Sequence, residues 1–192
     1  MVLSYIFNNI KDIKLFCCHI NYNNRKESEI ERDFLIEYCK KNNITLFVKN
    51  IEHIKRGEIK REDYENETKE IKFNFYKNLC EKLDCDGVFL AHHEDDKIEN
   101  IFNNIMRGRK DITDLTVIKE KNNILNVNIY RPMLSHNKDD IYFLSDKYQI
   151  PYFLDTTPKW SCRGKMRNNI FPTCLDCYNN NYKKSLLKLG KE

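Results

Sequence analysis

The residues best suited to chemistry stand in one run, His92–Asp96, which reads HHEDD. An apolar segment, 88–91, precedes the run, and apolar residues at helical spacing follow it over 98–105. A turn between a strand and a helix lies at the carboxyl end of the strand, where open parallel sheets bind ligands. Capping the helix requires one side-chain oxygen, whereas this turn supplies three carboxylates and two imidazoles. We therefore expect a ligand site that could hold a divalent metal, with a well-capped surface helix as the alternative.

Strand-like and helix-like patterns alternate on both sides of this run. The apolar runs predict strands, and the helical periodicities predict helices. Strands are expected at 14–20, 44–48, 88–91 and 151–154, and helices at 1–10, 27–42, 62–83, 138–148 and 182–189. Residues 116–130 show short strand-like runs split at Asn122-Asn123, and Ser135 is expected to cap the helix at 138–148. The alternation predicts an α/β fold with a mainly parallel sheet, which would bring Asn21, His92–Asp96 and Asp155 to one edge.

Bulk properties place the chain among ordinary globular proteins. Its 192 residues are 41% hydrophobic, which suits one domain with a substantial core. The net charge of +4 is only weak support for a nucleic-acid partner. No apolar run approaches the roughly 18 residues that a membrane span needs, and residues 1–10 carry no signal-peptide pattern. We expect a cytoplasmic protein without a membrane partner.

Six of the eight cysteines fall into two groups, and the other two, Cys85 and Cys162, are not arranged as a pair. Four lie in apolar patterns and are expected to be small core residues, namely Cys17, Cys18, Cys39 and Cys80. Cys174 and Cys177 have the C-x-x-C spacing of metal ligands, but one such pair supplies only half of a tetrahedral site. A metal site and an ordinary pair of thiols are both open interpretations.

Six short segments, taken in order, resemble the catalytic domain of tRNA(isoleucine) lysidine synthetases, which are N-type ATP pyrophosphatases of the PP-loop superfamily. They are HINYNNR from His19, HHEDDKIEN from His92, IMRG from Ile105, RPML from Arg131, PYFLD from Pro151 and RGKMRNNIFP from Arg163. The resemblance implies a PP-loop-type ATP pyrophosphatase domain over 1–172, followed by a C-terminal tail or helix at 173–192. It also implies a Rossmann-like sheet with helices on both faces, of the adenine-nucleotide alpha-hydrolase type.

The resemblance implies a reaction as well. ATP would adenylate the C2 oxygen of the wobble cytidine of a tRNA, and the amine of L-lysine would then displace AMP. The implied cofactors are ATP and Mg²⁺, and the implied partners are L-lysine and an isoleucine tRNA with a CAU anticodon. A homodimer is left open as the assembly.

Site residues carry over position by position from the resemblance. Catalytic roles fall on His92, His93, Asp95 and Asp96, the last two also as Mg²⁺ ligands; nucleotide binding falls on His19, Asn21, Arg107 and Gly108; tRNA or substrate binding falls on Arg25, Arg131, Asp155, Arg163 and Arg167. Guanidinium groups suit phosphate and nucleotide chemistry. A solvated helix face is the alternative for the pair Arg163 and Arg167.

The chain also departs from the family pattern. The S-G-G-x-D-S loop that grips the pyrophosphate does not occur in the sequence, and residues 1–5 resemble the helix that follows that loop. We therefore expect an N-terminally truncated domain without its first strand, with little ATP turnover unaided. Gly164 and Lys165 replace an Asn-Arg pair of the family. Two further hypotheses are a related PP-loop tRNA thiolase, which would use Cys162, Cys174 and Cys177, and a non-catalytic RNA-binding relic.

Overall fold

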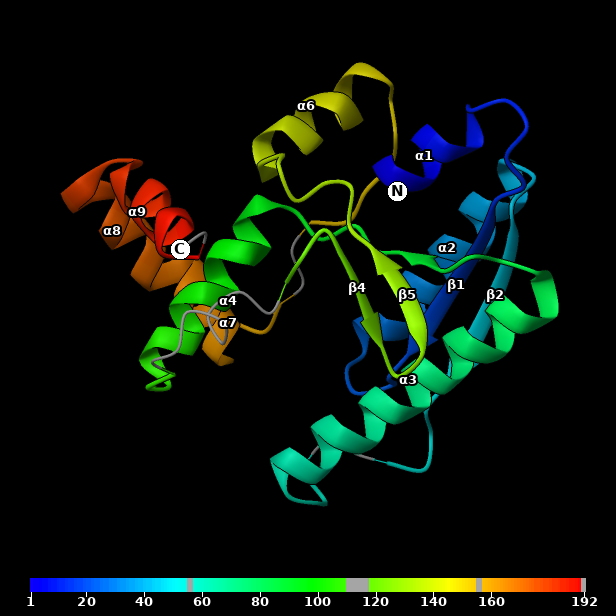
Figure 1. The fold of residues 1–192 in the computed structure, drawn as a ribbon, viewed down its shortest axis with the longest axis horizontal. Helices are drawn as coiled ribbons and strands as arrows, with labels where there is room; N and C mark the ends of the chain where they lie inside the picture. The colour runs from blue at the N-terminus through cyan, green and yellow to red at the C-terminus, as the bar shows by residue number, and fades with distance from the viewer. Residues whose placement is uncertain (55–56, 110–117, 155–156, 191–192) are drawn as a thin grey trace. The chain divides into compact units, whose positions relative to one another are not determined.

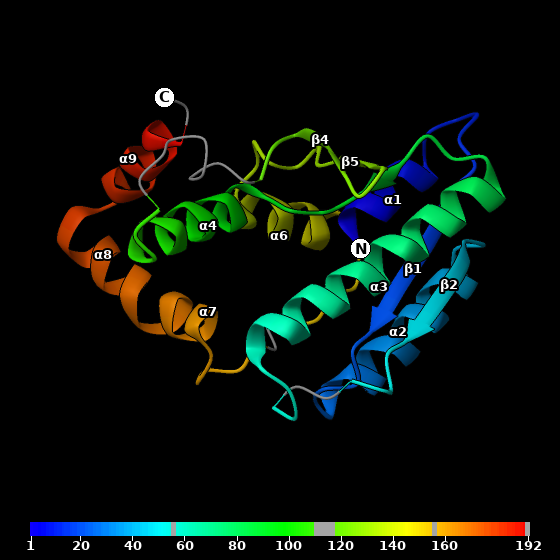
Figure 2. The ribbon, with the colours of Figure 1, turned by 60° about the horizontal axis from the view of Figure 1, so that its bottom comes forward.

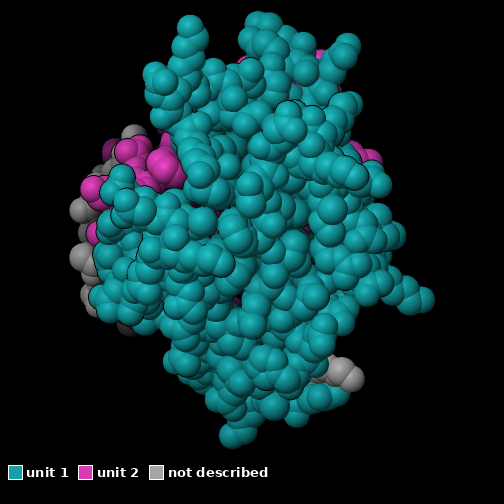
Figure 3. Space-filling view, turned by 90° about the vertical axis from the view of Figure 1, so that its right-hand side faces the viewer, with its two compact units in different colours: residues 1–88, 123–129, 147–153 teal, residues 89–122, 130–146, 154–192 magenta. Residues whose placement is uncertain are grey.

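The computed structural model describes residues 1–54, 57–109, 118–154 and 157–190. By internal contacts the chain divides into two compact units. Unit 1 comprises residues 1–88, 123–129 and 147–153, and unit 2 comprises residues 89–122, 130–146 and 154–192 (Figure 3). Each unit is described by itself. The expected domain at 1–172 with a tail at 173–192 stays a prediction.

Unit 1 is built around a strand, helix and strand. Strand β1 (Phe16–Asn21) pairs in parallel with β2 (Thr45–Asn50), and the helix α2 (Glu27–Lys41) connects them (Figure 1). The register places Phe16 opposite Thr45 and Asn21 opposite Asn50. Acidic residues in the first turn of α2 and lysines in its last turn both suit the helix dipole. This is the α/β unit with parallel strands that the sequence predicts.

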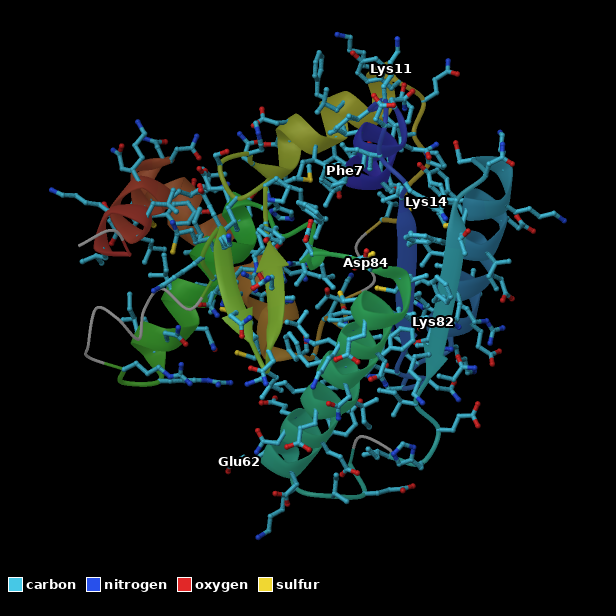
Figure 4. The ribbon with its side chains drawn as sticks, turned by 45° about the vertical axis from the view of Figure 1, so that its right-hand side comes forward. Phe7, Lys11, Lys14, Glu62, Lys82 and Asp84 are labelled. Carbon is cyan, nitrogen blue, oxygen red and sulfur yellow. The ribbon has the colours of Figure 1, made fainter. Side chains whose placement is uncertain are left out.

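Two more helices belong to unit 1. Helix α1 (Val2–Asn8) opens the chain, and α3 (Arg61–Leu83) is its longest helix. Glu62 and Asp84 mark the two ends of α3 in Figure 4. The helix ends because Asp84 adopts the left-handed conformation with φ of 53°. Tyr64, Phe73 and Tyr76 are buried aromatic residues of α3, and the helix confirms the prediction at 62–83.

Two cysteines of unit 1 lie in or beside its core. Cys39 is buried with Tyr38 and Ile44, and Cys17 packs against this cluster. Burial raises the pKa of Cys18 and of Cys39 to about 12. Thiols with such pKa values stay protonated and inert at neutral pH, as expected for small core residues.

A second sheet has the strand order β3-β5-β4, where β3 is Val88–Phe89, β4 is Lys121–Ile124 and β5 is Val127–Tyr130. Strands β4 and β5 form a hairpin whose two turn residues, Leu125 and Asn126, both have positive φ. The sequence prediction of a break at Asn122-Asn123 was therefore wrong. That dipeptide lies inside β4, and the turn comes two residues later.

Residues 151–154 do not form the strand that was expected there, since they adopt no regular secondary structure. Within unit 1, Phe153 packs edge-on against Phe34 of α2, with ring centroids 4.6 Å apart. All four residues of the run PYFL are exposed, Phe153 among them at 42%. The apolar pattern at 151–154 therefore indicated neither the strand nor the burial that it suggested.

Unit 2 is mainly helical. Its described helices are α4 (Glu94–Met106), α6 (Lys138–Lys147), α7 (Cys162–Lys165), the π-helical turn η1 (Met166–Ile170), α8 (Phe171–Tyr178) and α9 (Asn181–Leu189). The last residue of α6, Lys147, is assigned to unit 1. Figure 2 shows α7 leading to α8, with α9 returning toward α4. Phe171 joins these helices because its ring contacts Phe102 of α4 at 5.5 Å and Tyr182 of α9 at 5.9 Å. No helix of the described residues is long and apolar enough to cross a membrane.

Helix α6 begins with reciprocal caps between Asn137 and Asp140. The Asp140 amide donates to Asn137 Oδ1 at 2.9 Å, and the Asn137 amide donates to Asp140 Oδ2 at 3.2 Å. Asn137 is thus the cap, and the sequence prediction of Ser135 was wrong by two residues. Ser135 is exposed.

Helix α4 is anchored by Ile98 and Ile101, which are 1% and 0% exposed. We expect Ile101→Ala to lower the free energy of unfolding by about 2–5 kcal/mol, because the change removes buried methyl groups and leaves a cavity. Ile30→Ala is the matched control, since Ile30 also lies on a helix but is 60% exposed. Urea denaturation followed by circular dichroism measures both. Equal losses in the two variants would contradict this packing of α4.

Candidate functional site

The predicted turn lies between β3 and α4, as the sequence indicates. His93 is the N-cap of α4, and its amide donates to Asp96 Oδ2 at 3.2 Å. The Glu94 amide donates to the His136 carbonyl oxygen at 2.9 Å, which fixes the turn against the segment before α6. Asp96 therefore does act as a capping residue. The other acidic side chains have different partners.

Asp95 binds two groups from other helices of unit 2. Its Oδ2 accepts a hydrogen bond from the Lys138 amide at the start of α6 at 2.8 Å, and its Oδ1 accepts one from Lys183 Nζ of α9 at 2.7 Å. Burial raises the pKa of Asp95, but the bonds from Lys183 and from the Lys138 amide outweigh it and hold the pKa below its ordinary value. Burial lowers the pKa of Lys183, and the Asp95 carboxylate more than reverses this. Asp95 thus holds a primary ammonium group.

Glu99 is a central residue of the site that the sequence interpretation missed. Glu99 is 3% exposed, and its carboxylate binds two guanidinium groups. Arg163 Nε lies 2.8 Å from Oε2, and Arg167 binds both oxygens through Nε and a terminal nitrogen, the latter at 3.1 Å. Arg167 also lies 3.4 Å from Asp96 Oδ1. Glu99 follows Asp96 by three residues, so helical periodicity alone could have placed both carboxylates on one face of α4.

Arg131 is buried and supports the turn from behind. Its Nε donates to His92 Nδ1 at 3.1 Å, and one terminal nitrogen donates to the Lys119 carbonyl oxygen at 2.8 Å and to Asn122 Oδ1 at 2.7 Å. Because Nδ1 of His92 accepts this bond, the proton of the neutral ring resides on Nε2. Burial lowers the pKa of Arg131. Arg131 therefore orients His92, and its predicted contact with tRNA or substrate stays a prediction.

Seven of the predicted site residues gather in unit 2 around the start of α4. They are His92, His93, Asp95, Asp96, Arg131, Arg163 and Arg167. Together with Glu99 and Lys183 they form a network in which three carboxylates face one ammonium and two guanidinium groups. His93 Nδ1 is buried and has no hydrogen-bond partner among the described residues. The carboxylate oxygen Asp95 Oδ2 lies 3.8 Å from it.

Arg107 and Gly108 lie at the other end of α4. Arg107 is the exposed C-cap, and Gly108 has φ of 71°, which explains the glycine there. Twelve residues of helix separate Arg107 from Asp95, or roughly 18 Å along the axis. The structure therefore does not bring these two predicted nucleotide-binding residues to the start of the helix.

Three predicted residues belong to unit 1. His19 lies on β1, burial lowers its pKa, and its Nε2 is buried with no hydrogen-bond partner in the described parts of the chain. Asn21 is 3% exposed and accepts from the Asn23 amide at 3.0 Å, so it shapes the turn that ends β1. Arg25 pairs with Glu31 at 2.7 Å. Their roles stay predictions, and Asp155 lies outside the described residues.

The predicted cysteine pair lies on α8, where Cys174 is half-buried and Cys177 is exposed. Cys162 at the start of α7 is exposed, and its Sγ lies 4.0 Å from Asn103 Oδ1. Over residues 1–54, 57–109, 118–154 and 157–190, no three His, Cys, Asp or Glu side chains form a group that could hold a metal ion.

Comparisons with known proteins place the chain in a family. The model of the PP-loop domain matches residues 1–174. A tRNA(Ile)-lysidine synthase of Staphylococcus aureus (strain COL) is 32% identical over 98% of this chain and 44% of its own length. The enzyme of that name from Mycoplasmopsis pulmonis is 34% identical over 79% of this chain and 52% of its own length. The chain thus spans about half the length of these curated relatives.

A solved structure is similar in fold. It is the U34-tRNA thiolase NcsA from Methanococcus maripaludis with its [4Fe-4S] cluster, at a TM-score of 0.72 and 16% identity. The match covers 99% of this chain and 66% of that one. At this identity the likeness supports the α/β fold that the sequence predicts, and it carries no further argument about activity.

Replacing Glu99 tests the two-arginine contact. We expect Glu99→Gln to lower the free energy of unfolding by roughly 3 kcal/mol, because it leaves two guanidinium groups without their shared carboxylate. Glu81→Gln is the matched control, since the Glu81 side chain is 65% exposed and lies 3.9 Å from Lys77 Nζ. The control substitution should lower the free energy of unfolding by less than about 1 kcal/mol. Urea denaturation at neutral pH compares them. A Glu99→Gln variant as stable as the control would contradict the contact.

The Asp95–Lys183 pair predicts a dependence of stability on pH. The pKa of Asp95 is depressed in the folded state, so its contribution is present above its ordinary pKa and is lost as the pH falls through the folded value. We expect Lys183→Met to lower the free energy of unfolding by about 1 kcal/mol near pH 7 and by almost nothing near pH 2. The figure at pH 7 is small because both side chains are partly exposed. Urea denaturation of variant and wild type at both pH values measures this difference. An equal loss at both would refute the ion pair as its source.

Proposed function

Because the chain belongs to the PP-loop domain family, we propose that it is the ATP-using part of a tRNA-modifying enzyme of the tRNA(Ile)-lysidine synthase type. The family match covers residues 1–174, and the synthase relatives align over most of this chain. These relatives are about twice as long, so the activity of a complete protein is part of the proposal.

The proposed reaction has two steps. The C2 oxygen of a cytidine attacks the α-phosphorus of ATP and pyrophosphate leaves; the amine of L-lysine then attacks C2, loses a proton, and AMP leaves. Both leaving groups are phosphates that gather negative charge, so cationic side chains are required beside them. Arg163 and Arg167 supply two guanidinium groups, of which the Arg163 side chain is 51% exposed although it is paired with Glu99. A guanidinium can exchange a carboxylate for a phosphate because both present paired oxygens.

The contact between Asp95 and Lys183 is the observation that carries the proposal. Asp95 stands in the turn after β3 and holds a lysine ammonium at 2.7 Å. A reaction whose second substrate is L-lysine needs a carboxylate that binds the charged amine. Lys183 of α9 would then occupy the position of the substrate amine and would leave when L-lysine binds.

Magnesium fits the donor chemistry of the same turn. Asp95 and Asp96 offer hard oxygen ligands, and Mg²⁺ in nucleotide sites commonly takes one or two carboxylates together with phosphate oxygens. On Asp95 Oδ1 the ion would take the place of Lys183 during the first step, and the substrate amine would take that place in the second step. When bound, the ion would neutralise charge on the triphosphate.

We further propose that the tRNA is an isoleucine tRNA with a CAU anticodon, and that the protein acts in the cytoplasm, where tRNA, ATP and L-lysine occur together. The homodimer remains open within this proposal. No membrane partner is proposed.

Incorporation of labelled L-lysine into a CAU-anticodon tRNA transcript tests the function. Two proteins are assayed: this chain alone, and a chimera in which it replaces the matching part of the Staphylococcus aureus enzyme. We expect ATP-dependent incorporation in the chimera. Arg167→Lys should lower the rate at least about tenfold, because lysine cannot bind both oxygens of Glu99. Arg32→Lys is the control, since Arg32 pairs with its exposed neighbour Asp33.

Three outcomes of this assay would contradict the proposal. A folded chimera that binds tRNA but adds no lysine, while the parent enzyme does, would favour a non-catalytic RNA-binding role. Transfer of sulfur in place of lysine would favour the thiolase hypothesis. Equal rates in Arg167→Lys and Arg32→Lys would remove Arg167 from the site.

A further inference from the structure

A tight turn precedes α7 and is closed by four hydrogen bonds. The Ser161 amide and hydroxyl both donate to the Pro158 carbonyl oxygen, at 2.9 and 2.7 Å. The Gly164 amide donates to Ser161 Oγ at 3.0 Å, and the Lys165 amide donates to the Ser161 carbonyl oxygen at 2.8 Å. A Cβ on Gly164 would lie 2.1 Å from the Pro158 oxygen, so the glycine is what lets α7 rest on the turn. The backbone at 158–161 is therefore fixed.

Trp160 stands in this fixed turn with 68% of its residue surface exposed. A large aromatic ring held by a fixed backbone loses little conformational entropy when it binds a partner, because it has only two side-chain torsions. The indole also offers a broad apolar face for stacking. A single exposed ring is common on protein surfaces, so its surroundings decide what it could bind.

The sequence around Trp160 is basic. Between Pro158 and Pro172 it contains four basic residues and no acidic one; the basic residues are Lys159, Arg163, Lys165 and Arg167. Lys159 and Lys165 are exposed and lie on either side of Trp160 in sequence. Arg163 and Arg167 are paired with Glu99, and Arg167 also with Asp96. Two exposed lysines therefore accompany the exposed ring.

We propose that Trp160 is a stacking platform for an unpaired base of an RNA, with Lys159 and Lys165 binding the adjacent phosphates. Single-stranded RNA alternates flat bases with phosphates, and proteins bind it by combining aromatic rings with cations. An acidic peptide would use the cations but not the ring face. This inference rests on the proposed function, because it assigns the RNA contact of the same site, and it adds a binding residue that the family resemblance did not include.

The sequence makes the test direct, because Trp160 is the only tryptophan in the chain. We expect an RNA hairpin with a CAU loop to quench the tryptophan fluorescence of the full chain at low salt. Trp160→Leu should weaken binding of the labelled hairpin about tenfold by fluorescence anisotropy. Its salt dependence should stay unchanged, whereas Lys165→Ala should lower the slope of log K against log salt by about one. Trp160→Phe should retain most of the affinity.

Phe143→Leu is the matched control, since Phe143 is 66% exposed on α6 and has the acidic neighbours Asp139, Asp140 and Asp146. It should bind the hairpin as the wild type does. Circular dichroism and urea denaturation establish that each variant is folded. Binding without quenching, equal affinity in Trp160→Leu, or no binding of RNA by the wild type would overturn the proposal. Quenching by ATP alone, with RNA having no effect, would assign the ring to the nucleotide instead.

The two proposals can fail separately. Full RNA affinity in Trp160→Leu together with lysine incorporation by the chimera would reject the stacking platform and leave the proposed function intact. Quenching and weakened binding in Trp160→Leu, without lysine incorporation, would leave an RNA-binding surface and reject the lysidine reaction.

Discussion

The need to pair three clustered carboxylates at the start of α4 governs the structure of unit 2. Asp95, Asp96 and Glu99 occupy one face of the helix, and the latter two are buried. Charges removed from water are strongly destabilising unless opposite charges accompany them. The compensating groups come from α7, η1 and α9, which are 64 or more residues further along the chain. The C-terminal helices therefore return to α4 for electrostatic reasons as well as through the ring contacts of Phe171.

The same pairing gives the site its chemical character. The charges of the network are balanced without a ligand, so under the proposed function a phosphate or an amine would replace one member of an ion pair. Arg163, which is half exposed, and Lys183 of α9 are the members best placed to be replaced. Arg131 differs from them because it is buried behind His92 and makes four hydrogen bonds, three through its guanidinium and one through its backbone amide.

Sequence patterns predicted the parts of this arrangement that depend on neighbouring residues. The parallel strands around α2, the turn at 92–96 and the helix after it follow from local periodicity and from a dense run of polar residues. The patterns missed what depends on distant residues. Lys183 lies 88 residues from Asp95, and nothing in its local sequence marks it. Glu99 was visible at helical spacing from Asp96 but was not among the predicted site residues.

The smaller errors of the sequence prediction, at a helix cap, a hairpin turn and one apolar run, also arise where the structure depends on more than the local pattern. Asn137 and Ser135 are both good caps, and the choice between them depends on whether Asp140 can return a bond to the cap. The hairpin turn falls at Leu125-Asn126 because the backbone there adopts positive φ, although leucine seldom does so and Asn122-Asn123 was the stronger local signal. At 151–154 an apolar run satisfies a strand pattern without pairing in a sheet.

The central claim is that Asp95 is a binding site for an amine and that Lys183 occupies it in the absence of ligand. Isothermal titration calorimetry of L-lysine with the wild type and with Lys183→Met measures this most directly. The account predicts tighter binding of L-lysine to the variant, by about tenfold or less, because an internal competitor has been removed. Equal or weaker binding would show that Lys183 does not compete for the site.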